Sequence, residues 1–207
     1  KIAQKKSKGI AERNKELFED FWYTCLSLAR IPSNEEFEQS ELIRSLIGSH
    51  SKAFEACVQI YEISDFENSQ QGRKNDLLVF FALSYFAKRP NYSRMPRSLQ
   101  IDVKSHFLSI TDAREKGKDL LFSLSDTELI HSACVKAHAD LPASELNEGH
   151  DLIFHKKYLN ECPVTLRAYI GCAIQLYGDL DEVSLIKAHI RSGKVSLMVY
   201  DDFEKEV

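Results

Sequence analysis

Residues 76–87, with the sequence DLLVFFALSYFA, constrain the fold more than any other stretch of the chain. If this stretch is helical, apolar side chains occupy nearly every side of the helix. A surface helix has an apolar stripe and a polar back, whereas a helix that is apolar all round is normally buried. The stretch is shorter than the roughly 20 apolar residues that span a bilayer. We therefore expect it to form the central core helix of a soluble domain.

The cysteines indicate a reducing compartment. Cys25, Cys57, Cys134, Cys162 and Cys172 form no C-x-x-C pair and have mostly apolar neighbours. Reduced cysteines that pack as small hydrophobic side chains are typical of cytosolic proteins. The sequence shows no recognisable signal peptide or membrane span. We therefore expect a cytoplasmic protein without a membrane partner.

The overall charge excludes attraction of nucleic acid by the protein's field as a whole. Lys and Arg number 27 against 31 Asp and Glu, so the formal net charge is −4. A negatively charged protein can still bind nucleic acid where Lys and Arg gather on one face. Any such site in this chain must therefore be a local cluster of cationic side chains.

Residues 1–66 are expected to form a three-helix unit with the size of a helix-turn-helix. Apolar residues recur at helical spacing from about residue 13 to 29, and Pro32 ends that helix. The sequence SNEE at 33–36 has the form of a capping box and predicts the start of a second helix. Gly48 is expected to end the second helix, and a third follows directly.

The third helix would contact DNA if this unit were a helix-turn-helix. Its outward side chains are expected to include His50, Lys52, Glu55 and Gln59. Lys52 would contact phosphate, whereas His50 and Gln59 could read bases through hydrogen bonds. Glu55 would repel phosphate. Plain helix packing without a nucleic-acid role is an alternative that the sequence favours at least as much.

The second part of the chain, residues 72–207, is expected to be a helical domain ending in a β-hairpin, unless both parts pack as one. The polar residues 62–75 are expected to be a connector, with at most one short helical turn around Phe66. Thr111 or Asp112 is expected to cap one helix, and SDTE at 125–128 is a second capping box.

The segment before the hairpin contains one well-bounded helix. Residues 141–149 are expected to be a loop, followed by a short β-prone run at 152–154. Pro163 and Gly178 stand where proline and glycine typically flank a helix. Gly171, inside this helix, predicts the close approach of another element.

Two β-prone runs near the C-terminal end, residues 183–190 and 195–200, flank the turn sequence RSGK and predict a hairpin. Side chains alternate between the faces of a strand, so the apolar residues share one face. Cationic or titratable side chains share the other face, namely Lys187, His189 and Arg191, and Lys194 lies at the turn. They could contact phosphates, or form the solvated face of an antiparallel sheet. Asp201 and Asp202 would weaken the phosphate interpretation. The predicted fold class is α+β, mostly α-helical with a small C-terminal antiparallel hairpin or sheet.

A second basic cluster lies in the proline-rich residues 88–97. Arg94 and Arg97 stand near Tyr92, after two further basic residues. Basic side chains interleaved with an aromatic one could hold a nucleic-acid backbone. The alternative is a solvated connector that is anchored by the tyrosine.

The sequence lacks the common signatures of catalysis. It has no glycine-rich nucleotide loop, no G-x-S-x-G and no H-E-x-x-H, so no S-adenosylmethionine cradle is visible. His131, Cys134 and His138 would supply only three zinc ligands. A nucleophile pair of Cys162 or Cys172 with His155 is conceivable, but a packed cysteine is the better interpretation. We therefore assign no catalytic residue, no metal site and no cofactor to this chain.

Several stretches after residue 75 are similar to a known family: DLLVFFAL at 76–83, MPRSLQIDVK at 95–104, LFSL at 121–124, LRAYIGCA at 166–173, IKAH at 186–189 and KVSLMVYDDF at 194–203. Together they resemble the C-terminal part of the DNA phosphorothioation-associated methyltransferase family, over roughly two thirds of the chain. The resemblance implies a bacterial setting of sulfur-modified DNA and defence against foreign DNA. In that family a methyltransferase fold precedes this region and would bind S-adenosylmethionine. The chain would then be a fragment of such a protein or a stand-alone relative of its accessory region. No catalytic residue of the family maps onto these motifs.

The expected function is an accessory region that recognises DNA, with or without phosphorothioate, or RNA. A weaker resemblance of residues 21–54 to a small helical repeat attached to homing endonucleases favours the same function. The expected phosphate contacts are Lys187, His189, Arg191, Lys194, Arg94, Arg97 and Lys52, with His50 and Gln59 reading bases. The alternative is a protein–protein interaction scaffold that docks onto other proteins of a DNA modification system. An independent enzyme is disfavoured and would need a polar pocket lined by His155, Arg167 and His189.

Overall fold

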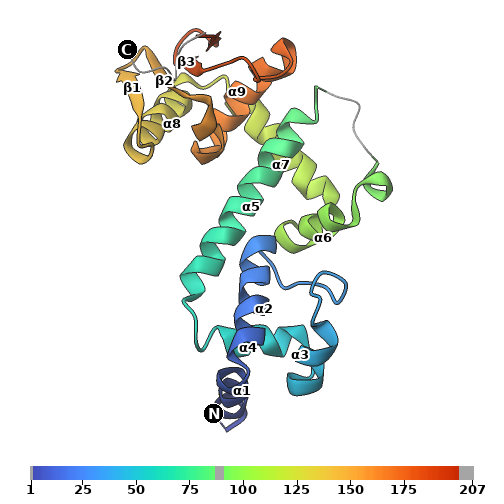
Figure 1. The fold of residues 1–207 in the computed structure, drawn as a ribbon. Coiled ribbons are helices and arrows are strands. Elements are labelled where there is room, and N and C mark those ends of the chain that lie inside the picture. The colour runs from blue at the N-terminus through green and yellow to red at the C-terminus, as the bar shows by residue number, and fades with distance from the viewer. Residues whose placement is uncertain (1, 87–90, 201–207) are drawn as a thin grey trace. The chain divides into compact units, whose positions relative to one another are not determined.

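The computed structural model describes residues 2–86 and 91–200 of the chain (Figure 1). The fold is mostly helical, with a small antiparallel sheet near its C-terminal end, which confirms the predicted α+β class. The chain divides into two compact units, Lys1–Asn75 and Asp76–Val207. Across the described residues, every helix is too short or too polar to cross a bilayer.

The first unit is built on aromatic packing. It contains α1 (Ile2–Arg13), α2 (Lys15–Leu28), α3 (Ser40–Ile47), α4 (His50–Cys57) and the beginning of α5 (Ile63–Leu83). Trp22 of α2 stacks on Tyr61 with ring centroids 5.4 Å apart. Phe66 of α5 is buried in the same cluster. Helix α1 is additional to the three expected helices, and its Ala11 is packed into this core at 1% exposure.

The capping-box sequence at 33–36 does not start a helix, so that prediction is wrong. The Glu36 carboxylate accepts a hydrogen bond from the Ser33 backbone N–H at 2.9 Å, as a capping box requires. It also accepts two hydrogen bonds of 2.7 Å from the Arg30 guanidinium, which lower the pKa of Glu36 to about 2. The Arg30 side chain is 4% exposed. The motif therefore closes a turn around a buried ion pair, and α3 begins only at Ser40.

Residues 63–75 are helical throughout, so this segment is not the expected connector with at most one helical turn around Phe66. They form most of the beginning of α5, where side chains bond along the helix, as Ser69 Oγ does to Asp65 O at 3.0 Å. Helix extension costs far less than helix nucleation. A polar segment joined to the apolar 76–83 and held by buried Phe66 therefore becomes helical without an apolar stripe of its own.

The apolar end of α5 is buried on one side only. Leu77, Phe81 and Ala82 are buried, whereas Phe80 is 40% exposed. Helix α7 (Ile110–Ser123) packs closely against α5 at Gly117, where an added Cβ would lie 2.7 Å from the Phe81 Cβ. Burial on all sides, which the composition predicted, is therefore wrong for this stretch.

The remaining helices of the second unit are α6 (Arg97–His106), α8 (Thr127–Asp140) and α9 (Val164–Tyr177), with short 3-10 helices η1 (Tyr92–Arg94) and η2 (Lys156–Glu161). The caps differ from the predicted ones. Ser109 accepts the Asp112 N–H at 3.0 Å and begins α7, and Asp126 accepts the Glu128 N–H at 2.9 Å and begins α8. In both cases the residue whose side chain reaches the free amides is the cap.

Helix α9 follows its prediction closely. Pro163 immediately precedes it and Gly178 follows it with φ 118°. A Cβ on Gly171 would lie 2.6 Å from the Leu83 Cδ1, so the expected close approach is confirmed.

The sheet has four strands in the order β1-β2-β3-β4, and all neighbours are antiparallel. The strands are β1 (Ser144–Asn147), β2 (Asp151–His155), β3 (Leu185–His189) and β4 (Val195–Met198). Strands β3 and β4 confirm the predicted hairpin, whereas β1 was expected to be a loop. The inner face joins the core of α8 and α9 through Leu152, Phe154, Ile186, Ala188, Ile130, Cys134, Leu166 and Ile170.

Candidate nucleic-acid interface

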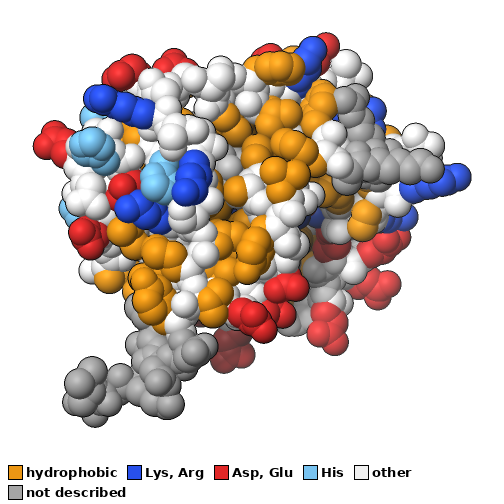
Figure 2. Space-filling view, turned by 90° about the horizontal axis from the view of Figure 1, so that it is seen from above, with side chains coloured by type: hydrophobic (Ala, Val, Ile, Leu, Met, Phe, Trp, Pro, Cys, Tyr) orange, Lys and Arg blue, Asp and Glu red, His pale blue; other side chains and the backbone are white. Residues whose placement is uncertain are grey.

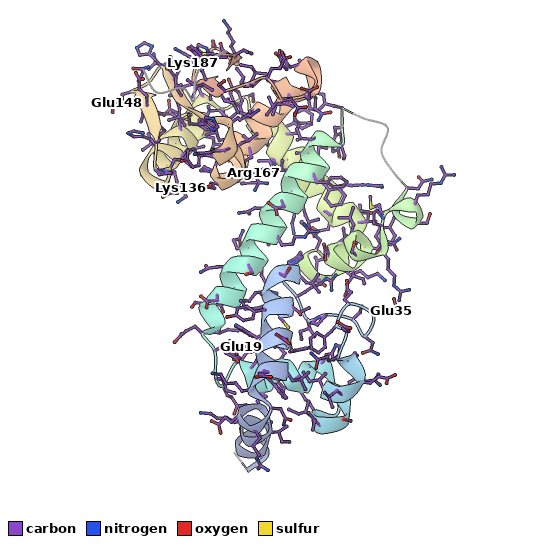
Figure 3. All side chains as sticks on the ribbon, in the orientation of Figure 1. Glu19, Glu35, Lys136, Glu148, Arg167 and Lys187 are labelled. Carbon is purple, nitrogen blue, oxygen red and sulfur yellow. The ribbon has the colours of Figure 1, made fainter. Side chains whose placement is uncertain are left out.

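Polar side chains gather on the outer face of the sheet around β3. The register pairs Asp151 of β2 with His189, and Lys187 with Ser196 of β4. Because side chains alternate along a strand, these four lie on the face opposite the buried Ile186 and Ala188. Figure 3 labels Lys187 among the side chains of this sheet. The fold therefore brings Lys187 and His189 together, as the alternation predicted. Arg191, predicted on the same strand face, instead follows the end of β3 in the hairpin turn.

Lys187 is held by an acidic partner that the sequence analysis did not identify. Its Nζ lies 2.9 Å from Asp151 Oδ2, and the two side chains are 26% and 11% exposed. Asn147 Nδ2 donates to Asp151 Oδ1 at 2.8 Å. Desolvation raises the pKa of Asp151, but these hydrogen bonds and the Lys187 charge outweigh it, so the pKa is lowered. Asp151 is therefore ionised at neutral pH and compensates the Lys187 charge.

His189 forms the next part of this face. Its Nε2 lies 3.1 Å from Ser196 Oγ. Desolvation lowers the pKa of His189, the charges of Lys187 and Lys194 act in the same direction, and Asp151 acts against them. The ring is therefore neutral at neutral pH in the unbound protein. An anion placed beside it would favour the charged form.

The hairpin turn carries the two most accessible cations of the cluster. Arg191 and Lys194 are both exposed. Tyr169 of α9 fixes this turn, since its hydroxyl donates to the carbonyl oxygens of His189 at 2.7 Å and Lys194 at 3.2 Å. Tyr169 is 7% exposed, and burial raises its pKa to about 12, so it stays a hydrogen-bond donor. The only sequence signal for this role was a hydroxyl on an apolar helix face, where buried tyrosine needs a partner.

The second basic cluster lies on other elements of the same unit. Arg94 of η1 and Arg97 at the start of α6 are exposed. Tyr92 is anchored by a hydrogen bond from its hydroxyl to Gln100 O at 3.1 Å, and Met95 is buried. The tyrosine therefore anchors the segment, as the alternative interpretation expected. Lys88, Arg89, Asp201 and Asp202 lie outside the described residues.

The first unit contains one predicted contact that the structure contradicts. His50 is 7% exposed, with Nδ1 2.8 Å from Pro32 O and Nε2 3.0 Å from Ser40 Oγ. It also packs edge to face on Phe21. His50 is the first residue of α4, where the helical pattern defines the outward direction poorly, so the prediction that it points outward is wrong.

The other two predicted contacts of the first unit remain accessible to different degrees. Lys52 is exposed, and its backbone N–H bonds to the capping Ser49 Oγ at 3.2 Å. Gln59 is half-buried and follows the end of α4, where its Nε2 donates to Glu55 O at 3.0 Å. The base-reading role predicted for Gln59 therefore has to compete with an existing hydrogen bond.

The groups considered for catalysis are not assembled into a site. Burial raises the pKa of Cys162 to about 12, so it is a thiol and a poor nucleophile. His155 lies at the end of β2 opposite to the Asp151–His189 pair. Arg167 forms an ion pair of 2.8 Å with Asp76. Within the ranges 2–86 and 91–200, no group of three or more His, Cys, Asp or Glu side chains could hold a metal ion.

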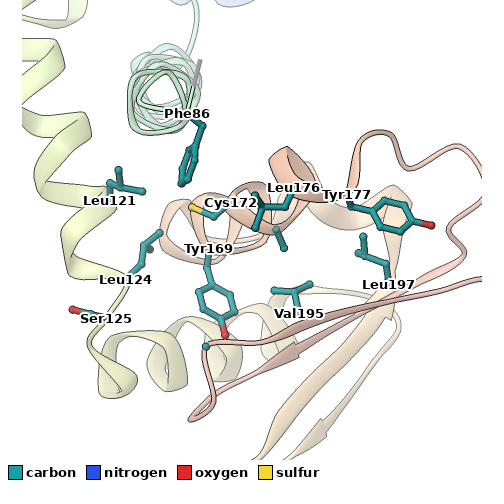
Figure 4. A pocket seen from close by; sticks show the side chains of 12 residues that line it. Phe86, Leu121, Leu124, Ser125, Tyr169, Cys172, Leu176, Tyr177, Val195 and Leu197 are labelled. Carbon is teal, nitrogen blue, oxygen red and sulfur yellow. The ribbon is translucent and has the colours of Figure 1, made fainter. Parts of the chain in front are cut away.

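A second surface feature of this unit is an apolar groove of about 730 Å³ between α7, α9 and β4 (Figure 4). Its lining residues include Phe86, Leu121, Leu124, Tyr169, Cys172, Leu176, Tyr177, Val195 and Leu197. Figure 2 shows hydrophobic side chains gathered on one face of the molecule, with a group of Lys, Arg and His side chains on the same face.

Neither a protein-family model nor a curated protein nor a solved structure matches the chain significantly. The role of these two surfaces must therefore follow from their own geometry and charge.

Proposed function

We propose that the chain is a non-catalytic accessory region that binds a nucleic-acid backbone through the β3–β4 hairpin. One observation carries the proposal: Lys187, His189, Arg191 and Lys194 lie on one strand face and its adjoining turn. Cationic side chains that follow a strand can neutralise successive phosphates. The family resemblance supports DNA, with or without phosphorothioate, ahead of RNA, in bacterial DNA modification and defence. The proposal places the protein in the cytoplasm and leaves S-adenosylmethionine to the methyltransferase part of a full-length parent.

The four side chains would act at different stages of binding. Arg191 and Lys194 are exposed and would make the first phosphate contacts. Lys187 would contribute only after a phosphate competes with Asp151 for its ammonium group. His189 would add a charge when a phosphate oxygen approaches its ring and favours protonation. Arg94, Arg97 and Lys52 are additional candidates on other elements, and Gln59 stays the candidate for base contact.

The test is binding of the full chain to fluorescent duplex DNA, plain and phosphorothioated, across roughly 50 to 200 mM salt. The double variant Arg191→Gln/Lys194→Gln removes two exposed charges and leaves the Asp151–Lys187 pair intact. If both contact phosphate, the slope of log K against log salt falls in magnitude by about 1.8, at about 0.9 per contact. The control Lys104→Gln/Lys118→Gln changes the net charge equally at exposed helix positions.

Two results would contradict the proposal. One is absence of binding at low salt to either duplex and to single strands. The other is an equal loss of affinity in the hairpin variant and the Lys104/Lys118 control, which would indicate only an effect of net charge. Tighter binding of the phosphorothioated duplex would extend the proposal from backbone binding to recognition of the modification.

A second candidate function is a protein–protein interaction scaffold that docks onto other proteins of a DNA modification system. The apolar groove is the observation that favours it, because contiguous exposed apolar surface on a protein typically marks an interaction site. Specific capture of a purified partner by a chain that binds no nucleic acid would select this function over the first.

A further inference from the structure

We infer that the groove between α7, α9 and β4 binds an amphipathic helix of a partner protein, with apolar side chains along one face and Lys or Arg at one end. This inference rests on the scaffold function and specifies its partner. It does not depend on nucleic-acid binding by the hairpin.

The floor of the groove is one face of α9. Tyr169, Cys172, Leu176 and Tyr177 lie along it at spacings of three, four and one residues, which covers about 12 Å of helix at 1.5 Å per residue. Figure 4 shows these four side chains on α9, between Leu121 on one side and Leu197 on the other. A floor of about two helical turns matches the length over which a bound helix places anchors at positions i, i+3 or i+4, and i+7.

The walls of the groove come from elements far apart in the sequence. Leu121 and Leu124 stand on one side at the end of α7, together with Phe86. Val195 and Leu197 stand on the other side, on β4. These walls are almost entirely apolar. The Tyr169 hydroxyl is already engaged by the hairpin carbonyls, so it is not available to orient a polar ligand.

The groove is open, which separates it from a small-molecule pocket. Leu176 is 85% exposed, Tyr177 is 56% exposed and Phe86 is 49% exposed. A drug-sized ligand normally has 70–90% of its surface enclosed by its site. Large apolar side chains that stand this far into solvent cannot enclose a small molecule, but they can lie against the side of a helix.

Charge at one end of the groove defines the partner further. Directly after Tyr177 the chain carries exposed Asp179, Asp181 and Glu182. Lys156 Nζ approaches this loop but bonds to the carbonyl oxygens of Leu180 and Asp181, at 2.6 and 2.7 Å. In the part of the chain that the structure describes, none of the three carboxylates forms an ion pair.

This acidic end discriminates among possible occupants. Lys or Arg on a partner helix would complement it and help to fix the direction of binding. Nucleic acid and an anionic membrane surface would both be repelled by it. A second copy of this chain in a symmetric pairing would bring the same acidic loop with it, so self-association is disfavoured by like charge.

The test uses the full chain and a labelled synthetic peptide of about 18 residues, with Leu at helical face positions and Lys in its last turn. Two matched peptides serve as controls, one with Glu in place of the Lys residues and one with the Leu positions scrambled. We expect saturable binding of the first peptide and at least about tenfold weaker binding of both controls. Fluorescence anisotropy measures all three.

Variants of the chain locate the binding. Leu176→Glu should weaken the binding of the first peptide by at least about tenfold. Leu108→Glu, at a residue that is 93% exposed and outside the groove, should leave its affinity unchanged. Asp181→Asn/Glu182→Gln should reduce the preference for Lys over Glu peptides, with folding checked by circular dichroism.

Several results would overturn the inference. These are no binding of the Lys peptide, equal binding of the Glu or scrambled peptide, or unchanged affinity in Leu176→Glu. A concentration-dependent dimer that Leu176→Glu abolishes would assign the groove to a second copy, and vesicle binding lost in the same variant would assign it to a membrane. Duplex binding is measured on the same variants to separate nucleic-acid binding by the hairpin from helix binding by the groove, because Leu176→Glu adds its charge outside the hairpin.

Discussion

Replacement of Asp151 by Asn tests whether Lys187 is a restrained phosphate contact. The Asp151 Oδ2 that now accepts from Lys187 Nζ at 2.9 Å would become an amide N–H₂ group, which cannot accept that bond. The Oδ1 atom could still accept from Asn147 Nδ2. We therefore expect the Lys187 ammonium group to turn towards solvent and to become available to a ligand.

The expected effect on binding is an increase. One additional phosphate contact steepens the slope of log K against log salt by about 0.9, which corresponds to about eightfold tighter binding near 0.1 M salt. The effect on stability is opposite. Loss of an ion pair whose members are 11% and 26% exposed should lower the free energy of unfolding by about 1–3 kcal/mol, less than for a fully buried pair.

The assay is anisotropy of a labelled duplex over roughly 50 to 200 mM salt, with thermal unfolding measured in parallel. The matched control is Asp140→Asn, because Asp140 pairs with Lys136 at 2.9 Å on an exposed helix surface. Each substitution removes one negative charge and changes the net charge from −4 to −3. An unchanged slope in Asp151→Asn, or an equal gain in Asp140→Asn, would refute the reasoning.

Four further predictions concern the framework. Tyr169→Phe removes the hydroxyl that holds the hairpin turn, so duplex affinity should fall although the charge does not change. The free energy of unfolding should also fall, by about 1–3 kcal/mol, and a lower melting temperature would show it. Gly117→Ala should lower the free energy of unfolding by about 1–3 kcal/mol, because the added Cβ would lie 2.8 Å from the α5 backbone. Gly72→Ala should raise it by about 0.4–1 kcal/mol, because the added Cβ would meet no atom within 4 Å. Urea unfolding measures both. Glu36, whose pKa falls from 4.5 to about 2 on folding, contributes stability above pH 4.5 that is lost towards pH 2. In urea unfolding, Glu36→Gln should therefore differ most from the unsubstituted protein above pH 4.5, and a pH-independent difference would contradict this.

Elements with a local signal could be predicted from the sequence. The hairpin was visible because alternation and turn chemistry agree over 183–200, and α9 because Pro163 and Gly178 flank a periodic run. Strand β1 had no such signal. Its four residues SELN gain their partners from β2, and pairing across a turn at Gly149 cannot be seen in so short a polar segment.

In the candidate site, too, some features could be predicted from the sequence and others could not. Alternation correctly placed Lys187 and His189 on one face, because a strand fixes the side on which each residue lies. Their partners were not predictable, since Asp151 and Ser196 reach them only through the strand register. The prediction that His50 faces solvent was wrong because its partners lie elsewhere in the fold. A polar residue at the start of a helix is expected to face solvent. In the fold, Pro32 and Ser40 instead provide hydrogen-bond partners for both ring nitrogens of His50.

Tyr169 has a consequence that reaches beyond its own hydrogen bonds. Its ring lines the groove, while its hydroxyl fixes the carbonyl oxygens of His189 and Lys194 in the hairpin. A ligand that moves the ring therefore changes the conformational freedom of the turn that presents Arg191 and Lys194. If occupation of the groove changes the affinity of the hairpin for its ligand by some factor, occupation of the hairpin must change the groove affinity by the same factor. One phenol side chain would then make two chemically unlike surfaces a single thermodynamic unit.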